Sequence, residues 1–97
     1  MDKDALRAVC STLSAYKLPS THAMVLLMVN ENDVSMQDIS KQGGFTTANS
    51  TGIVDTMESR GYVKRYHNTE DRRKVMVKIL EPGIAIIHNI LRHIKDL

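Results

Sequence analysis

The sequence predicts a mainly helical α+β fold that carries one small antiparallel β-ribbon of two to three strands. Apolar residues recur at helical spacing in five segments, whereas apolar and polar residues alternate within residues 62–80. Glycine or proline stands at most of the boundaries between these segments. The chain has 97 residues, 42% of them hydrophobic, so we expect a single globular domain over residues 1–97.

The first two predicted helices lie on either side of Pro19. Residues 2–16 carry apolar side chains at the spacing of one helical face. Pro19 interrupts this helix, and Ser20 or Thr21 is expected to cap the next one, which runs to about residue 30. Residues 23–29 are all apolar, so the second helix should be the buried centre of the domain.

Two short helices joined by a glycine-containing turn are predicted within residues 36–60. Ser35 is a typical N-cap, and an acidic residue follows it three positions later. Gly43 and Gly44 then turn the chain. The second helix ends before Gly61, a residue suited to the left-handed conformation at a helix C-terminus. This arrangement is the signature of a helix-turn-helix.

The alternating segment at residues 62–80 predicts a β-hairpin directly after the helix-turn-helix. Its two halves form the strands, and the polar stretch between them forms the loop. Val34 is expected to add a short third strand at the edge of the hairpin. Pro82 then opens a last helix over about residues 82–97, because a missing N–H is harmless at the start of a helix. A helix-turn-helix followed by such a hairpin, or wing, is a winged helix-turn-helix.

Positive charge is concentrated on the predicted wing, although the whole chain carries a net charge of only +2. Residues 60–78 hold seven lysines and arginines against two acidic residues, a local net charge of +5, and the rest of the chain has a net charge of −3. A localised basic surface is typical of a protein face that binds a polyanion. Charge alone leaves a second interpretation open, because lysines also protect hairpin edges from aggregation.

The second helix of the predicted helix-turn-helix is the expected recognition helix. Its inward face holds Ser50, Ile53, Val54 and Met57. Asn49 suits the paired hydrogen bonds of an adenine edge, and Ala48 or a threonine methyl group suits thymine. The expected DNA-binding residues are Ser35, Gln37, Thr46, Thr47, Ala48, Asn49, Thr51, Lys64, Arg65, Arg72, Arg73 and Lys74. In the alternative interpretation, the threonine-rich stretch serves only as a helix cap and turn.

The order of elements and two motifs resemble the MarR family of bacterial transcriptional regulators. The first motif is residues 55–65, which read DTMESRGYVKR, and the second is the wing tripeptide DRR at residues 71–73. The resemblance covers roughly residues 18–83. It implies a recognition helix in the major groove and a homodimer bound to a pseudo-palindromic operator. It also implies that Asp71 orients the wing and that Arg73, or its neighbour Arg72, enters the adjacent minor groove.

Three positions depart from the family pattern. Ser50 stands where family members commonly have an apolar residue, and Gly52 stands where a basic residue is frequent. Gly52 lowers helix propensity by about 1 kcal/mol relative to alanine. Leu80 replaces the usual threonine cap of the last helix. Both terminal helical regions are also shorter than is typical of the family.

Apolar stripes on the first and last helices predict a homodimer interface, because a winged domain needs a partner to read two half-sites one helical turn apart. The expected interface residues are Leu6, Leu13, Ile84, Ile87, Leu91 and Ile94. The stripe on the last helix could instead complete the core of its own domain.

Other kinds of site are not indicated. Cys10 is the single cysteine, so no internal disulfide can form, and a buried structural thiol is favoured over a redox sensor. The chain shows neither a secretory leader nor an apolar run long enough for a membrane, so we expect a cytoplasmic protein without a membrane partner. No pattern of residues indicates an enzyme, a metal site or a cofactor, and the sequence does not identify a small-molecule effector.

The sequence thus favours a DNA-binding transcriptional regulator, with a dimeric repressor that occludes promoter DNA as the leading hypothesis. Two alternatives remain open at this point: a winged-helix module that binds protein, and a DNA replication accessory factor. Sequence-selective, salt-sensitive DNA binding would separate the regulator from the protein-binding module. The position of the footprint, at a promoter or at a replication origin, would separate it from the replication factor.

Overall fold

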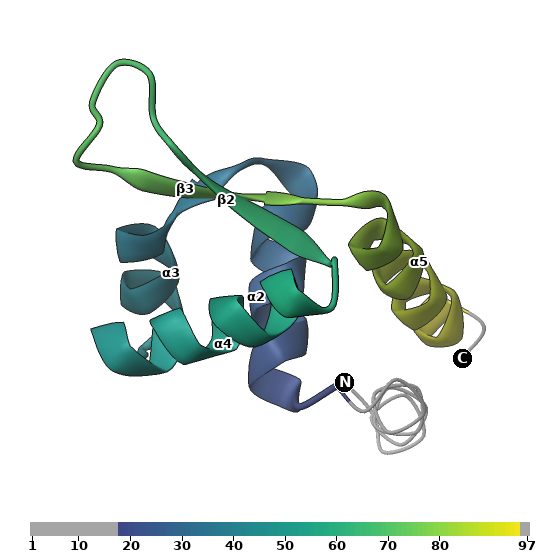
Figure 1. Ribbon diagram of the computed structural model, residues 1–97. Coiled ribbons are helices and arrows are strands. Elements are labelled where there is room, and N and C mark those ends of the chain that lie inside the picture. The colour runs from purple at the N-terminus through teal and green to yellow at the C-terminus, as the bar shows by residue number, and fades with distance from the viewer. Residues whose placement is uncertain (1–17, 96–97) are drawn as a thin grey trace.

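The computed structural model describes residues 18–95, with side chains up to residue 92, as four helices and a three-stranded antiparallel sheet (Figure 1). The elements in chain order are α2 (Ser20–Glu31), β1 (Val34–Ser35), α3 (Met36–Gly43), α4 (Thr47–Ser59), β2 (Val63–His67), β3 (Val75–Ile79) and α5 (Glu81–Lys95). This agrees with the predicted mainly helical α+β class. Five helices were predicted, but the first of them, at residues 2–16, lies outside the described residues.

The start and the burial of α2 differ from the prediction. The N-cap is Pro19, with no side-chain cap, and its carbonyl oxygen accepts the backbone N–H groups of His22 and Ala23. The expectation that Ser20 or Thr21 caps the helix is therefore wrong. One face of α2 is buried, yet Met24 and Leu27 are 43% and 44% exposed on the other. An all-apolar stretch indicated complete burial, whereas the described neighbours cover only part of the helix.

The sheet has the strand order β1-β3-β2, so the short strand at Val34 pairs with the hairpin as predicted. Val34 lies opposite Val77, and on the other side of β3 Val77 lies opposite Arg65. Val63 and Val77 are buried. Figure 1 shows the hairpin loop between β2 and β3 projecting beyond the helices.

The hydrophobic core lies where the four helices meet one face of the sheet. Its completely buried side chains include Leu26 from α2, Ile39 from α3, Val54 from α4, Val77 from β3 and Ile87 from α5. The four helices and the β2–β3 hairpin therefore share one core, and this shared packing fixes the position of α4 relative to the wing.

Left-handed glycines end both helices of the helix-turn-helix. Gly44 follows α3 with φ 69°, and Gly61 follows the C-cap of α4 with φ 79°. Residues with a Cβ rarely adopt such positive φ values, so both positions favour glycine. The last helix begins at Glu81, one residue before the predicted Pro82.

Candidate nucleic-acid interface

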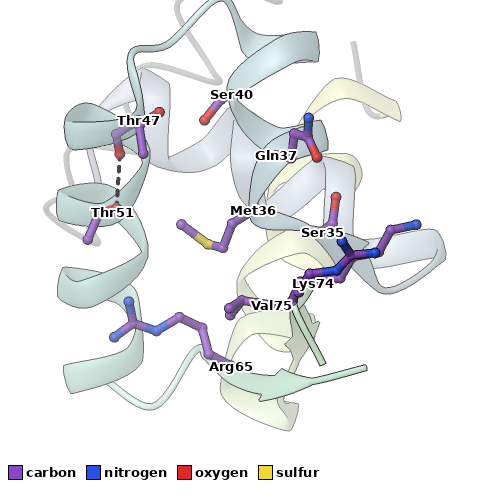
Figure 2. Close-up of a pocket in the computed structure, with 10 residues that line it drawn as sticks. Ser35, Met36, Gln37, Ser40, Thr47, Thr51, Arg65, Lys74 and Val75 are labelled. Carbon is purple, nitrogen blue, oxygen red and sulfur yellow. Dashed lines mark hydrogen bonds between the residues drawn. The ribbon is translucent and has the colours of Figure 1, made fainter. Parts of the chain in front are cut away.

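A cavity of about 410 Å³ lies between the start of α3, the first half of α4 and the root of the wing. Seven of the twelve residues predicted to bind DNA line it: Ser35, Gln37, Thr47, Thr51, Arg65, Arg73 and Lys74. Figure 2 shows the side chain of Arg65 extending from β2 toward α4, with Thr47 and Thr51 on α4. Residues far apart in the sequence thus form one surface with a cationic side.

Hydroxyl groups cap both helices of the helix-turn-helix. Ser35 Oγ accepts the backbone N–H of Asp38 at 3.0 Å, as predicted. Thr46 Oγ1 accepts the backbone N–H of Asn49 at 3.1 Å, so Thr46 rather than Thr47 caps α4. These caps leave Thr47 as the first helical residue, on the border of the cavity.

The inward face of α4 is the predicted one. Ser50, Ile53, Val54 and Met57 are all buried. The hydroxyl groups of Ser50 and Ser40 lie 2.7 Å apart and join α4 to α3. A buried hydroxyl without a hydrogen bond would be unfavourable, and this contact satisfies the serine that departs from the family pattern.

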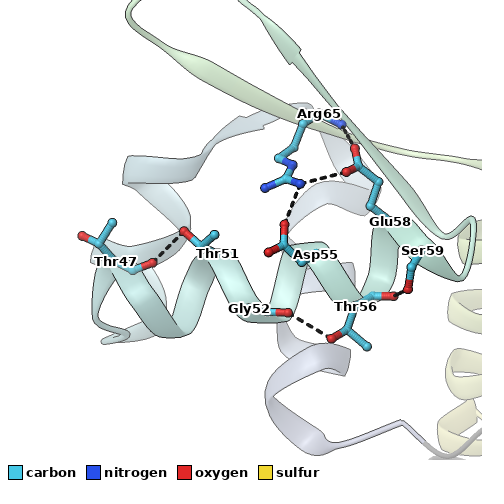
Figure 3. A network of polar contacts seen from close by, with 8 residues as sticks. All are labelled: Thr47, Thr51, Gly52, Asp55, Thr56, Glu58, Ser59 and Arg65. Carbon is cyan, nitrogen blue, oxygen red and sulfur yellow. Dashed lines mark hydrogen bonds and ion pairs between the residues drawn. The ribbon is translucent and has the colours of Figure 1, made fainter.

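On the exposed side of α4, hydroxyl groups donate hydrogen bonds to the backbone of the same helix (Figure 3). Thr51 Oγ1 donates to the carbonyl oxygen of Thr47 at 2.9 Å, and Thr56 Oγ1 donates to that of Gly52 at 3.0 Å. Ser59 Oγ donates to the carbonyl oxygen of Thr56 at 2.7 Å. A hydroxyl group has a single proton, so these donors are already used within the helix.

Arg65 connects the wing to the recognition helix through two carboxylates of α4 (Figure 3). Its Nη2 lies 2.6 Å from Asp55 Oδ1 and 2.9 Å from Glu58 Oε1, and its backbone N–H donates to Glu58 Oε2 at 2.9 Å. The backbone hydrogen bond, followed by the side-chain bond, lowers the pKa of Glu58. The bond to Glu58 is also the main cause that raises the pKa of Arg65. Much of the positive charge of Arg65 is therefore balanced within the chain.

The wing loop is shaped by its own polar groups. Asn68 Oδ1 accepts the backbone N–H groups of Glu70 and Asp71 at 2.8 and 3.1 Å. The ring Nδ1 of His67 lies 3.0 Å from the carbonyl oxygen of Arg72. An Asn side chain that bonds the backbone two and three residues ahead is a typical device for stabilising a turn. The loop therefore holds its tip through local hydrogen bonds.

Asp71 sets the direction in which Arg73 leaves the loop. Asp71 Oδ1 accepts both the backbone N–H and the Nε of Arg73 at 3.1 Å. The side-chain hydrogen bond from Arg73 is the main cause that lowers the pKa of Asp71. The side chain of Arg73 is 91% exposed, so it can still approach an anion.

The remaining predicted DNA-binding residues lie outside the cavity. Ala48 and Asn49 line a second groove of about 440 Å³ on the side of α4 that faces His22. Burial, and then the charge of Arg60, lower the pKa of His22. Thr46 is exposed at the start of α4, and Arg72 is exposed at the wing tip.

Lys64 is the predicted DNA-binding residue that the fold separates most clearly from the others. It pairs with Lys78 in the hairpin, and strand residues alternate between the two faces of a sheet. Lys64 therefore lies on the sheet face opposite that of its neighbour Arg65, which reaches α4.

The predicted dimerisation residues have different environments. Leu91 is 44% exposed on α5, and Ile84 is half-buried. Ile87 is completely buried in the core of its own chain, so it offers no surface to a second copy, and its assignment to an interface is corrected. Leu6 and Leu13, and the side chain of Ile94, lie outside the described part of the structure.

Several groups at the interface were not predicted from the sequence. Met36, Ser40 and Val75 also line the cavity, and Glu58 holds Arg65. Asn68 had a local signal, because asparagine favours turns. The other four residues had no local sequence signal, since their roles depend on contacts between separate elements.

Two further observations bear on other kinds of function. Among the side chains described, no cluster of three or more histidine, cysteine, aspartate or glutamate residues is placed to hold a metal ion. Within residues 18–95, no helix combines the length and the apolar character needed to cross a bilayer.

Comparison with known proteins identifies relatives that are HTH-type transcriptional regulators. An uncharacterized HTH-type transcriptional regulator of Bacillus subtilis, YfiV, is 34% identical over 67 residues, which are 69% of this chain and 42% of the relative. The HTH-type transcriptional repressor YetL of the same organism is 31% identical over 68 residues, which are 70% of this chain and 41% of the relative. The chain thus spans about two fifths of the length of each of these relatives.

Solved structures show the same fold. A complex of MepR from Staphylococcus aureus with DNA superposes with a TM-score of 0.86 at 14% sequence identity, over 93% of this chain and 75% of that one. A mutant MarR from Escherichia coli in complex with operator DNA superposes with a TM-score of 0.81 at 24% identity, over 91% of this chain and 64% of that one.

A sequence model of the MarR family matches residues 17–75, well over half of the chain and including the helix-turn-helix and most of the wing. The resemblance first indicated by the motifs at residues 55–65 and 71–73 is thereby confirmed. The chain belongs to the MarR family.

Proposed function

We propose that this protein binds double-stranded DNA and regulates transcription, as a dimeric repressor that occludes promoter DNA. The observation that carries the proposal is the single surface on which α3, α4 and the wing bring together seven predicted DNA-binding residues. The relatives support it, since YetL is a repressor and the MepR and MarR structures are complexes with DNA.

In the proposed complex, the first half of α4 enters the major groove and the wing approaches the adjacent minor groove. The exposed Arg73 is the candidate minor-groove residue, and Lys74 is a candidate for phosphate contact. The N-terminal N–H groups of α4, next to Thr46 and Thr47, suit a phosphate because a helix N-terminus is partly positive. The Asp55–Arg65 pair keeps the carboxylate of Asp55 compensated near the phosphates.

The proposed assembly is a homodimer on a pseudo-palindromic operator. The exposed Leu91 and the half-buried Ile84 on α5 are candidates for its interface, together with Leu6 and Leu13 of the predicted first helix. We also propose a cytoplasmic localisation, because promoter DNA lies in the cytoplasm of bacteria such as Bacillus subtilis, the organism of the two relatives.

Selection of bound sequences from a random DNA pool, followed by fluorescence anisotropy titrations, tests this function. We expect an enriched sequence with two related half-sites and an affinity that falls as salt rises. Each neutralised phosphate should contribute about −0.9 to the slope of log K against log salt. Failure to enrich any sequence, together with no binding at low salt, would overturn the proposal.

A further inference from the structure

The recognition helix α4 contains no lysine or arginine. The commonest specific contact in a major groove is a pair of hydrogen bonds from one of these residues to guanine. Arg60, at the C-cap, stands about 18 Å of helical rise away from Ala48, near the opposite end of the helix. The part of α4 that would enter the groove therefore lacks the usual reader of guanine.

The acidic side chains of α4 are also engaged. Aspartate and glutamate can accept a hydrogen bond from the N4 amino group of cytosine. Asp55 and Glu58 instead bind Arg65, at 2.6 and 2.9 Å from its Nη2. Within α4, therefore, neither member of a G·C pair meets an unengaged charged side chain suited to it.

Thr51 offers mainly its methyl group to a base. Its Oγ1 donates a hydrogen bond to the carbonyl oxygen of Thr47 at 2.9 Å (Figure 3). The N7 and O6 atoms of guanine are acceptors, so Thr51 would need its hydroxyl proton to bind them. The γ-methyl group and the acceptor lone pairs of Oγ1 remain available for contact.

The neighbours of Thr51 on this face are small. Ala48 and Gly52 are exposed, and they stand three residues before and one residue after Thr51. A Cβ atom at Gly52 would meet no heavy atom within 4 Å, so the packing of the chain does not require a glycine there. Because these side chains are so small, the helix can approach the base edges closely.

Asn49 adds a polar group that suits adenine. It is exposed beside Ala48 and Gly52 on the second groove. A side-chain amide can form paired hydrogen bonds with adenine N6 and N7. Asn49 on the second groove therefore suits adenine, and the methyl group of Thr51 on the first cavity suits thymine.

We propose that α4 selects A·T base pairs, and that the methyl group of Thr51 reads the 5-methyl group of thymine. This inference rests on the proposed function, because it specifies which duplex the same surface binds. Gly52 and Ala48 permit the close approach that such a methyl contact needs.

Thymine-to-deoxyuridine replacement tests the inference, because deoxyuridine lacks only the 5-methyl group. The probe is a duplex with the sequence enriched from the random pool, in which each thymine is replaced in turn. We expect replacement at one or two positions of each half-site to weaken binding about fourfold, the effect of removing one buried methyl group. Replacements elsewhere in the same duplex serve as controls.

Two variants of Thr51 assign the methyl contact to this residue. Thr51→Ser removes the methyl group and keeps the hydroxyl, so its affinities for the thymine and deoxyuridine duplexes should become nearly equal. Thr51→Val keeps a methyl group and removes the hydroxyl, so it should retain the preference of about fourfold. Thermal unfolding of both variants verifies that they are folded at the temperature of the titration.

The outcomes separate this inference from the proposed function. Enrichment of G·C pairs at the positions that face α4, or equal binding of thymine and deoxyuridine duplexes, would overturn A·T reading while DNA binding stands. A preference that survives in Thr51→Ser but disappears in Thr51→Val would assign the reading to the hydroxyl group and would also overturn the inference. Absence of binding to any duplex would overturn both proposals.

Discussion

At the scale of single residues, the buried hydroxyl of Ser50 is the most informative group in the helix-turn-helix. It lies 2.7 Å from the hydroxyl of Ser40, and Ser50 is completely buried. A hydrogen bond between two helices can specify their relative position, whereas an apolar contact tolerates sliding.

The Ser40–Ser50 contact leads to a prediction about stability. Ser40→Ala leaves the Ser50 hydroxyl without its partner and should lower the free energy of unfolding by about 1–2 kcal/mol. Replacing both serines with alanine should lower the free energy of unfolding by about 1 kcal/mol less than the sum of the two single replacements. Urea denaturation of the four proteins measures this coupling. Strictly additive effects would show that the contact contributes nothing.

Gly52 should separate stability from DNA binding. Gly52→Ala is expected to raise the free energy of unfolding by about 0.5–1 kcal/mol, because glycine is a poor helix former and the added Cβ has open space. The same Cβ would stand on the surface proposed to face DNA, so affinity should fall. Thermal melts and anisotropy titrations give the two values. A stabilised variant with unchanged affinity for DNA would show that Gly52 does not lie at the DNA interface.

At the scale of elements, the wing holds an exposed arginine on a loop that is shaped by local hydrogen bonds. Arg73→Ala should weaken DNA binding and make the salt slope shallower, because one positive charge of the proposed minor-groove contact is lost. Thermal stability should change little, since the side chain is 91% exposed. Arg92→Ala on α5 removes the same charge far from the wing and serves as the control. An equal loss of affinity in both variants would point to a general charge effect.

The link between α4 and β2 should depend on pH. Hydrogen bonds from Arg65 hold the pKa of Glu58 below its ordinary value of 4.5. The folded state therefore binds this proton less readily than the unfolded state. The stabilisation is present above about pH 4.5, and it is lost as pH falls through the lower folded pKa.

Glu58→Gln should remove this part of the pH dependence. We expect the variant to be less stable than the original protein near neutral pH and to approach it as acidity increases. Melting temperatures measured between about pH 7 and pH 3 provide the comparison. Glu70→Gln, on the exposed wing loop, is the matched control and should leave the profile nearly unchanged. A constant difference across the pH range would contradict the role given to Glu58.

At the scale of the whole molecule, α5 contributes to both the core and the exposed surface. Leu91→Glu should convert the proposed dimer to a monomer and weaken binding to a two-half-site operator, with little effect on folding, because Leu91 is 44% exposed. Sedimentation measures the mass of the assembly. Ile87→Ala, one turn away but completely buried, should instead lower the free energy of unfolding by about 2–5 kcal/mol. A Leu91→Glu protein that remains dimeric would place the interface elsewhere.

Much of the fold could be predicted because local patterns encode it. The helical spacing of apolar residues predicted the inward face of α4, and the alternation of apolar and polar residues predicted the wing. The N-cap Ser35 marked the start of α3. Such features depend on backbone geometry and on neighbours within a few residues, so a single segment of sequence contains them. The threonine-rich face of α4 and the basic wing were evident at the same level.

Only the tertiary structure decided which side chains face one another. It joined Arg65 to Asp55 and Glu58 across two elements, and it left Met24 exposed within the all-apolar stretch of α2. It also buried Ile87 within its own chain. The sequence by itself determined the elements and their chemical faces, because local hydrogen bonds and hydrophobic period depend on nearby residues. The partners of each face depend on how the packed elements are placed in space, which no single segment specifies.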